Sequence, residues 1–172
     1  MAIVIRPSRT EDGRALQEIE RLASERFREV GLDLVADDGP ESLEILAGYA
    51  AAGRGWTAVD DLDEPVGYVL VEDVDGNAHI EQLSVHPDFQ GIGIGRALLD
   101  RVRAWAADTG RPAITLTTFA SVPWNLPLWE HLGFVALTQH DVGPGLRAIR
   151  AAETARGLDV ATRVCMRLDL DR

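Results

Sequence analysis

The sequence predicts an α/β (α+β) protein in which a central mixed, mostly antiparallel sheet of about seven strands is flanked by helices. Seven short segments alternate apolar and polar residues or are rich in β-branched residues, as is typical of strands. Four longer segments place apolar residues at helical spacing. Between a predicted strand and a predicted helix lies a turn with three alternate glycines, Gly91, Gly93 and Gly95. These three features together predict the fold class.

The first 55 residues predict one strand and two helices. Residues 3–6 are a β-branched run ended by Pro7 and predict the first strand. Thr10 is the predicted cap of a helix that Gly31 ends, because two acids follow it near the positive end of the helix dipole. After a loop over residues 33–39, Pro40 is the predicted start of the second helix, which ends at Gly53.

The middle of the chain predicts an antiparallel meander followed by a parallel strand. Residues 56–59, 65–72 and 78–85 alternate as strands and are joined by turns at 60–64 and 75–77. A helix over residues 96–108 follows the glycine turn. Because the strand at 113–118 comes after a helix, we expect it to run parallel to the strand before that helix.

The last third predicts a short helix over residues 122–133, a strand at 134–137 and a final strand at 163–169. Between these two strands, residues 141–158 form a long connection that carries its own helical segment. Cys165 is the single cysteine, which excludes an internal disulfide, and its place in the final alternating run favours a buried thiol.

Length and composition predict one domain over residues 1–172, large enough to bury its own core. No apolar run reaches the roughly 18 residues of a membrane span, and the N-terminus lacks the pattern of a signal peptide, so we expect a cytoplasmic protein without a membrane partner. The formal net charge of −11 makes nucleic acid a poor candidate partner.

The glycine turn predicts a site for an anion. Glycine lets the backbone approach a ligand closely, and the N–H groups of the first helical turn have no partner inside the helix. The spacing differs from the G-x-G-x-x-G of dinucleotide folds, and no Lys-Ser or Lys-Thr pair follows as in a P-loop. The sequence therefore indicates a phosphate-bearing ligand of another kind.

Two motifs resemble those of the GNAT superfamily of N-acetyltransferases. Gln90, Gly93 and Gly95 match its acyl-coenzyme A motif, Gln/Arg-x-x-Gly-x-Gly/Ala. Residues 128–134, Leu-Trp-Glu-His-Leu-Gly-Phe, resemble the Leu-Tyr-Glu-Lys-Leu-Gly-Phe of the family, and Asn125 precedes them as in many members. The order of predicted elements is similar to the GNAT fold over nearly the whole chain. The resemblance implies a sheet splayed between its fourth and fifth strands and an acetyl-coenzyme A (acetyl-CoA) cosubstrate.

The resemblance also implies the residues that bind this cosubstrate. Backbone groups of the fourth strand would pair with the pantetheine arm, and the N–H of Leu83 would stabilise the oxyanion of the reaction. The helix start would bind the pyrophosphate, with Arg96 as a charged donor. For Asn125, a helix cap is the alternative role. The predicted coenzyme-binding residues are Leu83, Ser84, Val85, Gln90, Gly91, Ile92, Gly93, Ile94, Gly95, Arg96 and Asn125.

Acetylation of an amine needs a base, because the acceptor must lose a proton before it attacks the thioester. Strand alternation places His79 and Glu81 on the same face as Leu83, so both are candidate bases. A sheet-face side chain satisfied by its neighbours is the structural alternative for each. His86, which precedes Pro87, is interpreted as structural, and His131 and His140 show no metal-ligand spacing, so no metal site is predicted.

One departure from the family pattern concerns the leaving group. Trp129 stands where the family has a tyrosine that protonates the coenzyme thiolate, and an indole N–H is a very poor acid. Another group could supply the proton, with Tyr49 and Tyr68 as candidates, although packing roles are the alternative for both. The thiolate could instead leave without a specific acid, or the chain could be a non-catalytic acyl-CoA binding or sensing domain.

The leading hypothesis is an N-acetyltransferase, an acyltransferase acting on a primary amine of a small molecule. Acetylation of a protein N-terminus or lysine is the further alternative. Asp33, Asp37, Asp38 and Glu41 lie in the loop between the first two predicted helices, which the resemblance implies is part of the acceptor wall. These acids favour a cationic acceptor, and a solvated acidic loop is the alternative. Exposed edge strands could also pair between two copies of the chain, so a homodimer is a further possibility.

Overall fold

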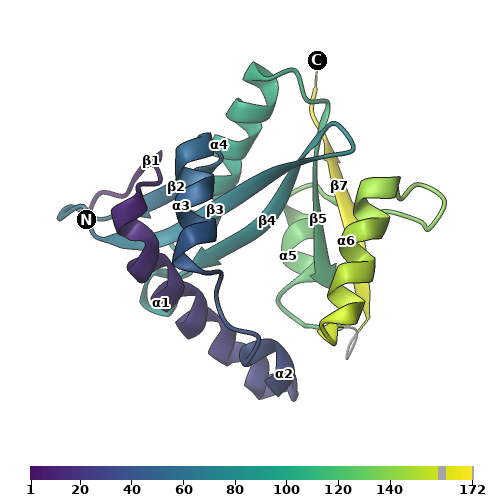
Figure 1. Cartoon of the computed structure of the whole chain (residues 1–172), viewed down its shortest axis with the longest axis horizontal. Helices are drawn as coiled ribbons and strands as arrows, with labels where there is room; N and C mark the ends of the chain where they lie inside the picture. The colour runs from purple at the N-terminus through teal and green to yellow at the C-terminus, as the bar shows by residue number, and fades with distance from the viewer. Residues whose placement is uncertain (159–161, 172) are drawn as a thin grey trace. The chain divides into compact units, whose positions relative to one another are not determined.

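The computed structural model describes residues 1–158 and 162–171 of the 172-residue chain. The chain forms two compact units, one of Met1–Glu72 and Ile80–Val102, and the other of Asp73–His79 and Arg103–Arg172. Strands β3 (Pro65–Val74) and β4 (Asn77–Val85) and helix α4 (Ile94–Asp108) each contribute residues to both units. Figure 1 labels the elements along the chain.

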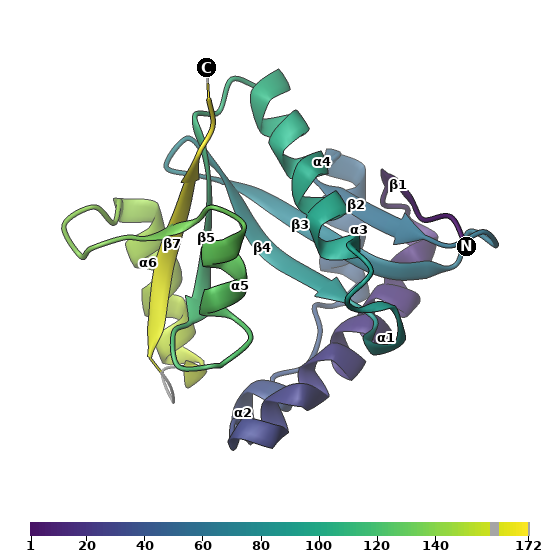
Figure 2. The same ribbon diagram turned by 180° about the vertical axis from the view of Figure 1, so that it is seen from behind.

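In the first unit, two helices cover one face of antiparallel strands. Figures 1 and 2 show α1 and α3 on one side of β2 and β3 and the start of α4 on the other. Buried residues of α1, α3 and β3 form a hydrophobic cluster, namely Leu16, Ile19, Leu46, Tyr68 and Leu70. The elements that lie wholly in this unit are β1 (Val4–Pro7), α1 (Gly13–Ser24), α2 (Asp33–Ala36), α3 (Leu43–Ala52) and β2 (Gly55–Val59), and β3 lies in it up to Glu72.

The helix starts of this unit differ from the predictions. Thr10 does not cap the first helix. Instead the chain makes a 3-10 turn over Thr10–Asp12, and the Asp12 carboxylate accepts the N–H of Arg9 at 2.7 Å. The second helix begins at Leu43 rather than at Pro40, because Ser42 Oγ accepts the N–H of Ile45. Part of the predicted loop at 33–39 is the short helix α2.

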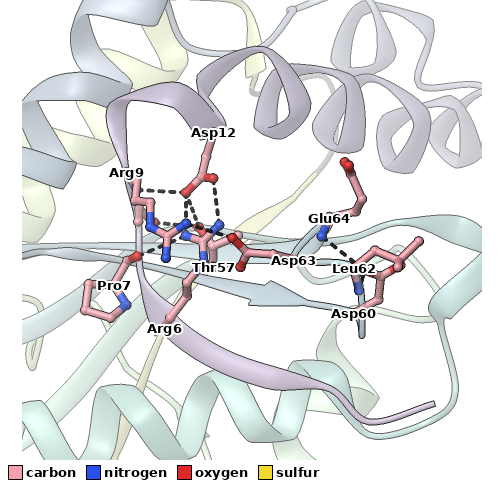
Figure 3. A network of polar contacts seen from close by, with 10 residues as sticks. Arg6, Pro7, Arg9, Asp12, Thr57, Asp60, Leu62, Asp63 and Glu64 are labelled. Carbon is pink, nitrogen blue, oxygen red and sulfur yellow. Dashed lines mark hydrogen bonds and ion pairs between the residues drawn. The ribbon is translucent and has the colours of Figure 1, made fainter.

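A buried ion pair joins the first strand to the first helix. Arg6 donates from both terminal nitrogens to the two oxygens of Asp12, at 2.8 and 2.9 Å, and its Nε reaches Asp63 at 2.8 Å (Figure 3). The Asp12 side chain is 6% exposed. Burial opposes ionisation of this carboxyl group, but hydrogen bonds from Arg6 and from the Arg9 backbone lower its pKa below the ordinary value.

In the second unit, the start of β4 pairs in parallel with β5 (Ala113–Phe119) at Ala78↔Ile114 and His79↔Thr115, as predicted. Strand β5 then pairs antiparallel with β7 (Arg163–Asp169), and β7 with β6 (Val135–Ala136). Helix α6 (Pro144–Ala155) covers one face of β5 and β7, and α5 (Leu126–His131) covers the opposite face (Figures 1 and 2).

The strand order β1-β2-β3-β4-β5-β7-β6 gives the mixed seven-stranded sheet that the sequence predicts. Cys165 is buried at 5% exposure, and this burial raises the pKa of its thiol, which confirms the interpretation of a packed side chain. Within residues 1–158 and 162–171, none of the helices is long and apolar enough to cross a membrane.

Candidate active site

The glycine turn has the backbone geometry that the sequence predicts for an anion site. Gly91 and Gly93 have φ values of 80° and 94°, which side chains rarely permit, and nothing lies within 4 Å of a Cβ built on either. Ala97 donates its N–H to Gly93 O at 3.0 Å. The N–H groups of Ile94 and Gly95 therefore precede the first bond of helix α4 and are free of partners inside it.

Two motif side chains flank this turn. Gln90 donates from Nε2 to the carbonyl of Val85 at 3.1 Å, which fixes the turn to the end of strand β4. Arg96 is exposed in the first turn of α4. His86 has the structural role predicted for it, because its Nδ1 accepts the N–H of Asp88 at the start of a 3-10 turn.

Close packing of β3 on the helix start explains why the turn is held where it is. A Cβ on Gly67 would lie 3.1 Å from a methyl carbon of Ile94 and 3.1 Å from the Ser84 carbonyl oxygen. A side chain at this position would push α4 away from the sheet. A cavity of about 260 Å³ lies beside the turn, lined by Leu22, Ala23, Glu25, Arg26, Glu29, Pro87 and Gln90.

The predicted base Glu81 is exposed on β4. Its charge, together with that of Glu72, acts on the hydroxyl of Tyr49 on α3. Glu72 hydrogen-bonds this hydroxyl and also pairs with Arg54 at 2.5 Å, so its negative charge is balanced. Burial first, and then these carboxylates, raise the pKa of Tyr49, so the phenol stays protonated as a donor. The sequence alone did not predict that Arg54 and Glu72 pair with each other near Tyr49, because no local pattern links these residues.

Further along β4, Leu83 and Val85 are partly buried, whereas Ser84 is 5% exposed. The Ser84 hydroxyl accepts from Gln82 Nε2 at 2.8 Å. Its side chain is therefore engaged within the protein, and the predicted coenzyme contact at this position would be made by the backbone.

The second candidate base, His79, is almost completely buried at 1% exposure. Its Nδ1 lies 2.9 Å from the hydroxyl oxygen of Thr115 on the neighbouring strand β5. Although strand alternation puts His79 and Glu81 on one face, their surroundings differ. Glu81 is open to solvent, and His79 is packed within the second unit.

The two tyrosines that could replace the missing acid are both hydrogen-bonded to carboxylates. Tyr68 is fully buried and donates its hydroxyl to Glu20 at 2.5 Å. Burial, followed by the charge of Glu20, raises its pKa well above the ordinary value, as for Tyr49. Neither tyrosine is therefore a strong acid.

Trp129 lies in α5 with its ring edge-on to Phe134, at a centroid distance of 5.4 Å.

The acids of the predicted acceptor wall are partly neutralised. Arg28 pairs with Asp37 at 2.5 Å and with Asp33 at 3.5 Å, and its hydrogen bond lowers the pKa of Asp37. Asp38 also has a partner in the protein. The loop is therefore less negative toward a ligand than its sequence indicates.

Asn125 stands at the N-cap position of α5, but its side chain makes no capping hydrogen bond. The structural alternative for this residue is therefore wrong. Within the described part of the chain, no group of three or more His, Cys, Asp or Glu side chains is arranged to hold a metal ion.

Two features of the turn suit the diphosphate of an acyl-CoA thioester. The two left-handed glycines expose main-chain N–H groups with open space beside them, and the exposed Arg96 adds a cation at the same helix start. A diphosphate needs several donors and little steric cover, and residues 91–96 offer both.

Comparisons with known proteins agree with this geometry. The sequence matches the acetyltransferase (GNAT) family over residues 16–134. It is 28% identical to the peptidyl-lysine N-acetyltransferase YjaB of Salmonella typhimurium, over 83% of this chain and 90% of that protein. It is 30% identical to the L-amino acid N-acyltransferase MnaT of Escherichia coli, over 58% of this chain and 49% of that protein.

The fold is similar to that of the PaiA N-acetyltransferase from Thermoplasma acidophilum, whose crystal structure contains coenzyme A. The TM-score is 0.74 at 16% sequence identity, covering 99% of this chain and 100% of that one. The matched family residues include the glycine turn and Trp129, and the strand order agrees with the fold that the two motifs imply. The chain therefore belongs to the acetyltransferase (GNAT) family.

Proposed function

We propose that residues 1–172 act as one N-acetyltransferase domain that moves an acetyl group from acetyl-CoA to a primary amine of a small molecule. The observation that carries this proposal is the turn at 91–96, with its left-handed glycines and its N–H groups at the start of α4. Structural neighbours that contain coenzyme A support the choice of cosubstrate.

Acetyl-CoA supplies the acetyl group as a thioester. In the proposed mechanism the N–H groups of residues 91–96 and the guanidinium of Arg96 hold the pyrophosphate. The N–H of Leu83 stabilises negative charge that develops on the thioester oxygen. Asn125, whose side chain is not used as a cap, contributes a hydrogen bond to the coenzyme.

We propose Glu81 as the base that takes the proton of the acceptor, directly or through water. Its support is exposure to solvent, since an incoming ammonium group can reach it without displacing packed side chains. His79 remains the second candidate, and its burial and its bond to Thr115 make it better suited to relay a proton than to meet the acceptor.

We further propose that the coenzyme thiolate leaves without a specific acid. The support is the presence of Trp129 at the motif position, and the engagement of Tyr49 and Tyr68 with carboxylates. A thiolate is a tolerable leaving group near neutral pH, so turnover does not require a phenol.

Peptidyl-lysine is the second candidate acceptor, favoured by the similarity to YjaB over most of both proteins. The chain itself contains no lysine, since all 17 basic residues of the Lys and Arg class are arginines. Acetyl-lysine detected in a mixture of enzyme and peptide would therefore come from the peptide.

The test is release of free coenzyme thiol from acetyl-CoA with three groups of acceptors: amino acids, polyamines and lysine-containing peptides. We expect saturable, amine-dependent release with at least one free amine. Release with peptides alone would favour the second candidate. Calorimetric binding of acetyl-CoA without amine-dependent release from any acceptor would contradict the proposed transferase and support a binding domain.

A further inference from the structure

Two arginines share one buried carboxylate between α6 and β7. Glu153 of α6 is 7% exposed, and its Oε2 pairs with Arg150 Nη1 at 2.8 Å and also with Arg163 Nε. Its Oε1 accepts the hydroxyl of Thr117 at 2.6 Å. We call these four residues, Thr117, Arg150, Glu153 and Arg163, the Arg150 cluster.

The Arg150 cluster contains two arginines and one carboxylate, so one positive charge is not balanced within it. Arg163 is packed over the ring of Phe119 at 4.2 Å, and it also donates to Thr117 at 2.9 Å. Burial lowers the pKa of Arg163, although Glu153 acts in the opposite direction. The neighbouring Cys165 thiol has a raised pKa, so it does not supply the missing negative charge. Within residues 1–158 and 162–171, no recorded ion pair gives the cluster a second carboxylate.

Arg150 is the member that a ligand can reach. Its side chain is 26% exposed, and its one recorded contact among the described residues uses Nη1 alone. Among residues 1–158 and 162–171, no acceptor is bonded to its Nε and Nη2 groups, so these are available to a ligand. A guanidinium presents paired N–H groups in a planar fork that matches both oxygens of a carboxylate.

The Arg150 cluster and the candidate base His79 are both bonded to side chains of β5 in the second unit. Thr115 and Thr117 point to the same face of β5, because they are two residues apart on one strand. Thr115 holds His79, and Thr117 holds Glu153. Two strand residues span roughly 7 Å, so Thr117 lies about that far along β5 from Thr115, and Arg150 is joined to Thr117 through Glu153.

We propose that Arg150 binds the carboxylate of the acceptor, so that the preferred acceptors are amines that also carry a carboxylate, as amino acids do. This inference rests on the proposed acetyltransferase function and narrows its acceptor class. Arg163 and Glu153 position Arg150 rather than contact the acceptor.

The experiment compares acceptor pairs that differ only in the carboxylate, lysine with cadaverine and phenylalanine with phenethylamine, by thiol release. For Arg150→Ala we expect kcat/KM for the amino acid to fall roughly ten- to hundredfold, since a charged hydrogen bond is lost. The value for the decarboxylated amine should change less than about twofold. Arg147→Ala is the matched control, because Arg147 is an exposed residue of the same helix whose side chain bonds the Val142 carbonyl.

Arg150→Lys gives a second measurement if the alanine variant folds poorly, as judged by circular dichroism. It keeps the charge and loses the fork, so we expect a smaller loss that is still confined to carboxylated acceptors. An equal effect on both members of each pair, including no effect, would overturn the proposal. So would a wild-type enzyme that prefers the decarboxylated amines. Absence of transfer to every acceptor would instead overturn the proposed function.

Discussion

Asp75 caps helix α6 from outside the helix, because its Oδ1 accepts the N–H of Gly145 at 2.8 Å. Its Oδ2 accepts the next N–H, that of Leu146, at 3.1 Å. Asp75 lies in the turn between β3 and β4, 70 residues before Gly145 in the sequence. A Cβ on Gly145 would lie 2.8 Å from this oxygen, which explains the glycine at the start of the helix.

Asp75→Ala should lower the free energy of unfolding by about 1 to 2 kcal/mol, since a helix N-terminus loses its acceptor. Asp75→Asn should cost less, because an amide oxygen can still accept one N–H and asparagine tolerates the left-handed φ of 53°. Urea unfolding measures both values. Glu130→Ala, which removes an exposed carboxylate of α5, is the control, and equal stability of the Asp75→Ala and control variants would disprove the capping role.

Gly93→Val should abolish most coenzyme affinity, by on the order of a hundredfold, because a branched side chain would strain the φ of 94° and cover the N–H groups at the helix start. Calorimetry with coenzyme A checks this. Gly110→Val is matched to it, since Gly110 also has a left-handed φ, of 71°, with open space around it. If the two variants bind coenzyme equally well, residues 91–96 are not the pyrophosphate site.

Glu81→Gln should reduce kcat near neutral pH roughly a hundredfold or more, with little change in coenzyme affinity, since an amide cannot accept the proton of the acceptor. Without the base, the variant depends on acceptor that has already lost its proton in solution, so its rate should rise more steeply with pH than that of the wild type. Glu44→Gln, at an exposed position in α3, should behave as wild type. An unchanged pH profile would remove Glu81 from the candidates and leave His79.

Trp129→Phe should leave the rate within a few-fold of wild type if the thiolate departs without a specific acid, because the indole N–H then has no part in proton transfer. Trp129→Tyr adds a phenol and should add an alkaline descent to the rate profile where that phenol ionises. Stopped-flow measurement of thiol release between neutral and alkaline pH gives both profiles. An alkaline descent already present in the wild type would show that another acid acts.

Asp12→Asn should lower the free energy of unfolding at pH 7 by about 3 kcal/mol, because it breaks a buried ion pair with Arg6. The pKa of Asp12 is depressed in the folded state, so its contribution is present above the ordinary value of 3.8 and is lost as pH falls through the lower folded value. Urea unfolding between pH 5 and pH 2 should therefore show a smaller pH dependence in the variant. A parallel loss in both proteins would show that other carboxylates dominate acid unfolding.

Much of the fold could be predicted because its signals are local. The alternating run at 163–169 coincides with β7, and the order of strands and helices follows from period and turn residues. The predicted first residues of the helices were less accurate. The first helix starts after a 3-10 turn in which the Asp12 side chain pairs with Arg6 and with the Arg9 backbone instead of capping the helix. The cap of α6 is Asp75, which lies 70 residues before Gly145, so no pattern near that helix reveals it.

The sequence by itself determined the turn at 91–96, because glycines at alternate positions and a helix start are local properties of the chain. Only the tertiary structure decided the environments of His79 and Glu81, which share a face of one strand yet differ in burial. Only the tertiary structure also brought Arg150 and Arg163 to one carboxylate. Burial and charge pairing depend on segments far apart in the sequence, and those meet only when the chain packs.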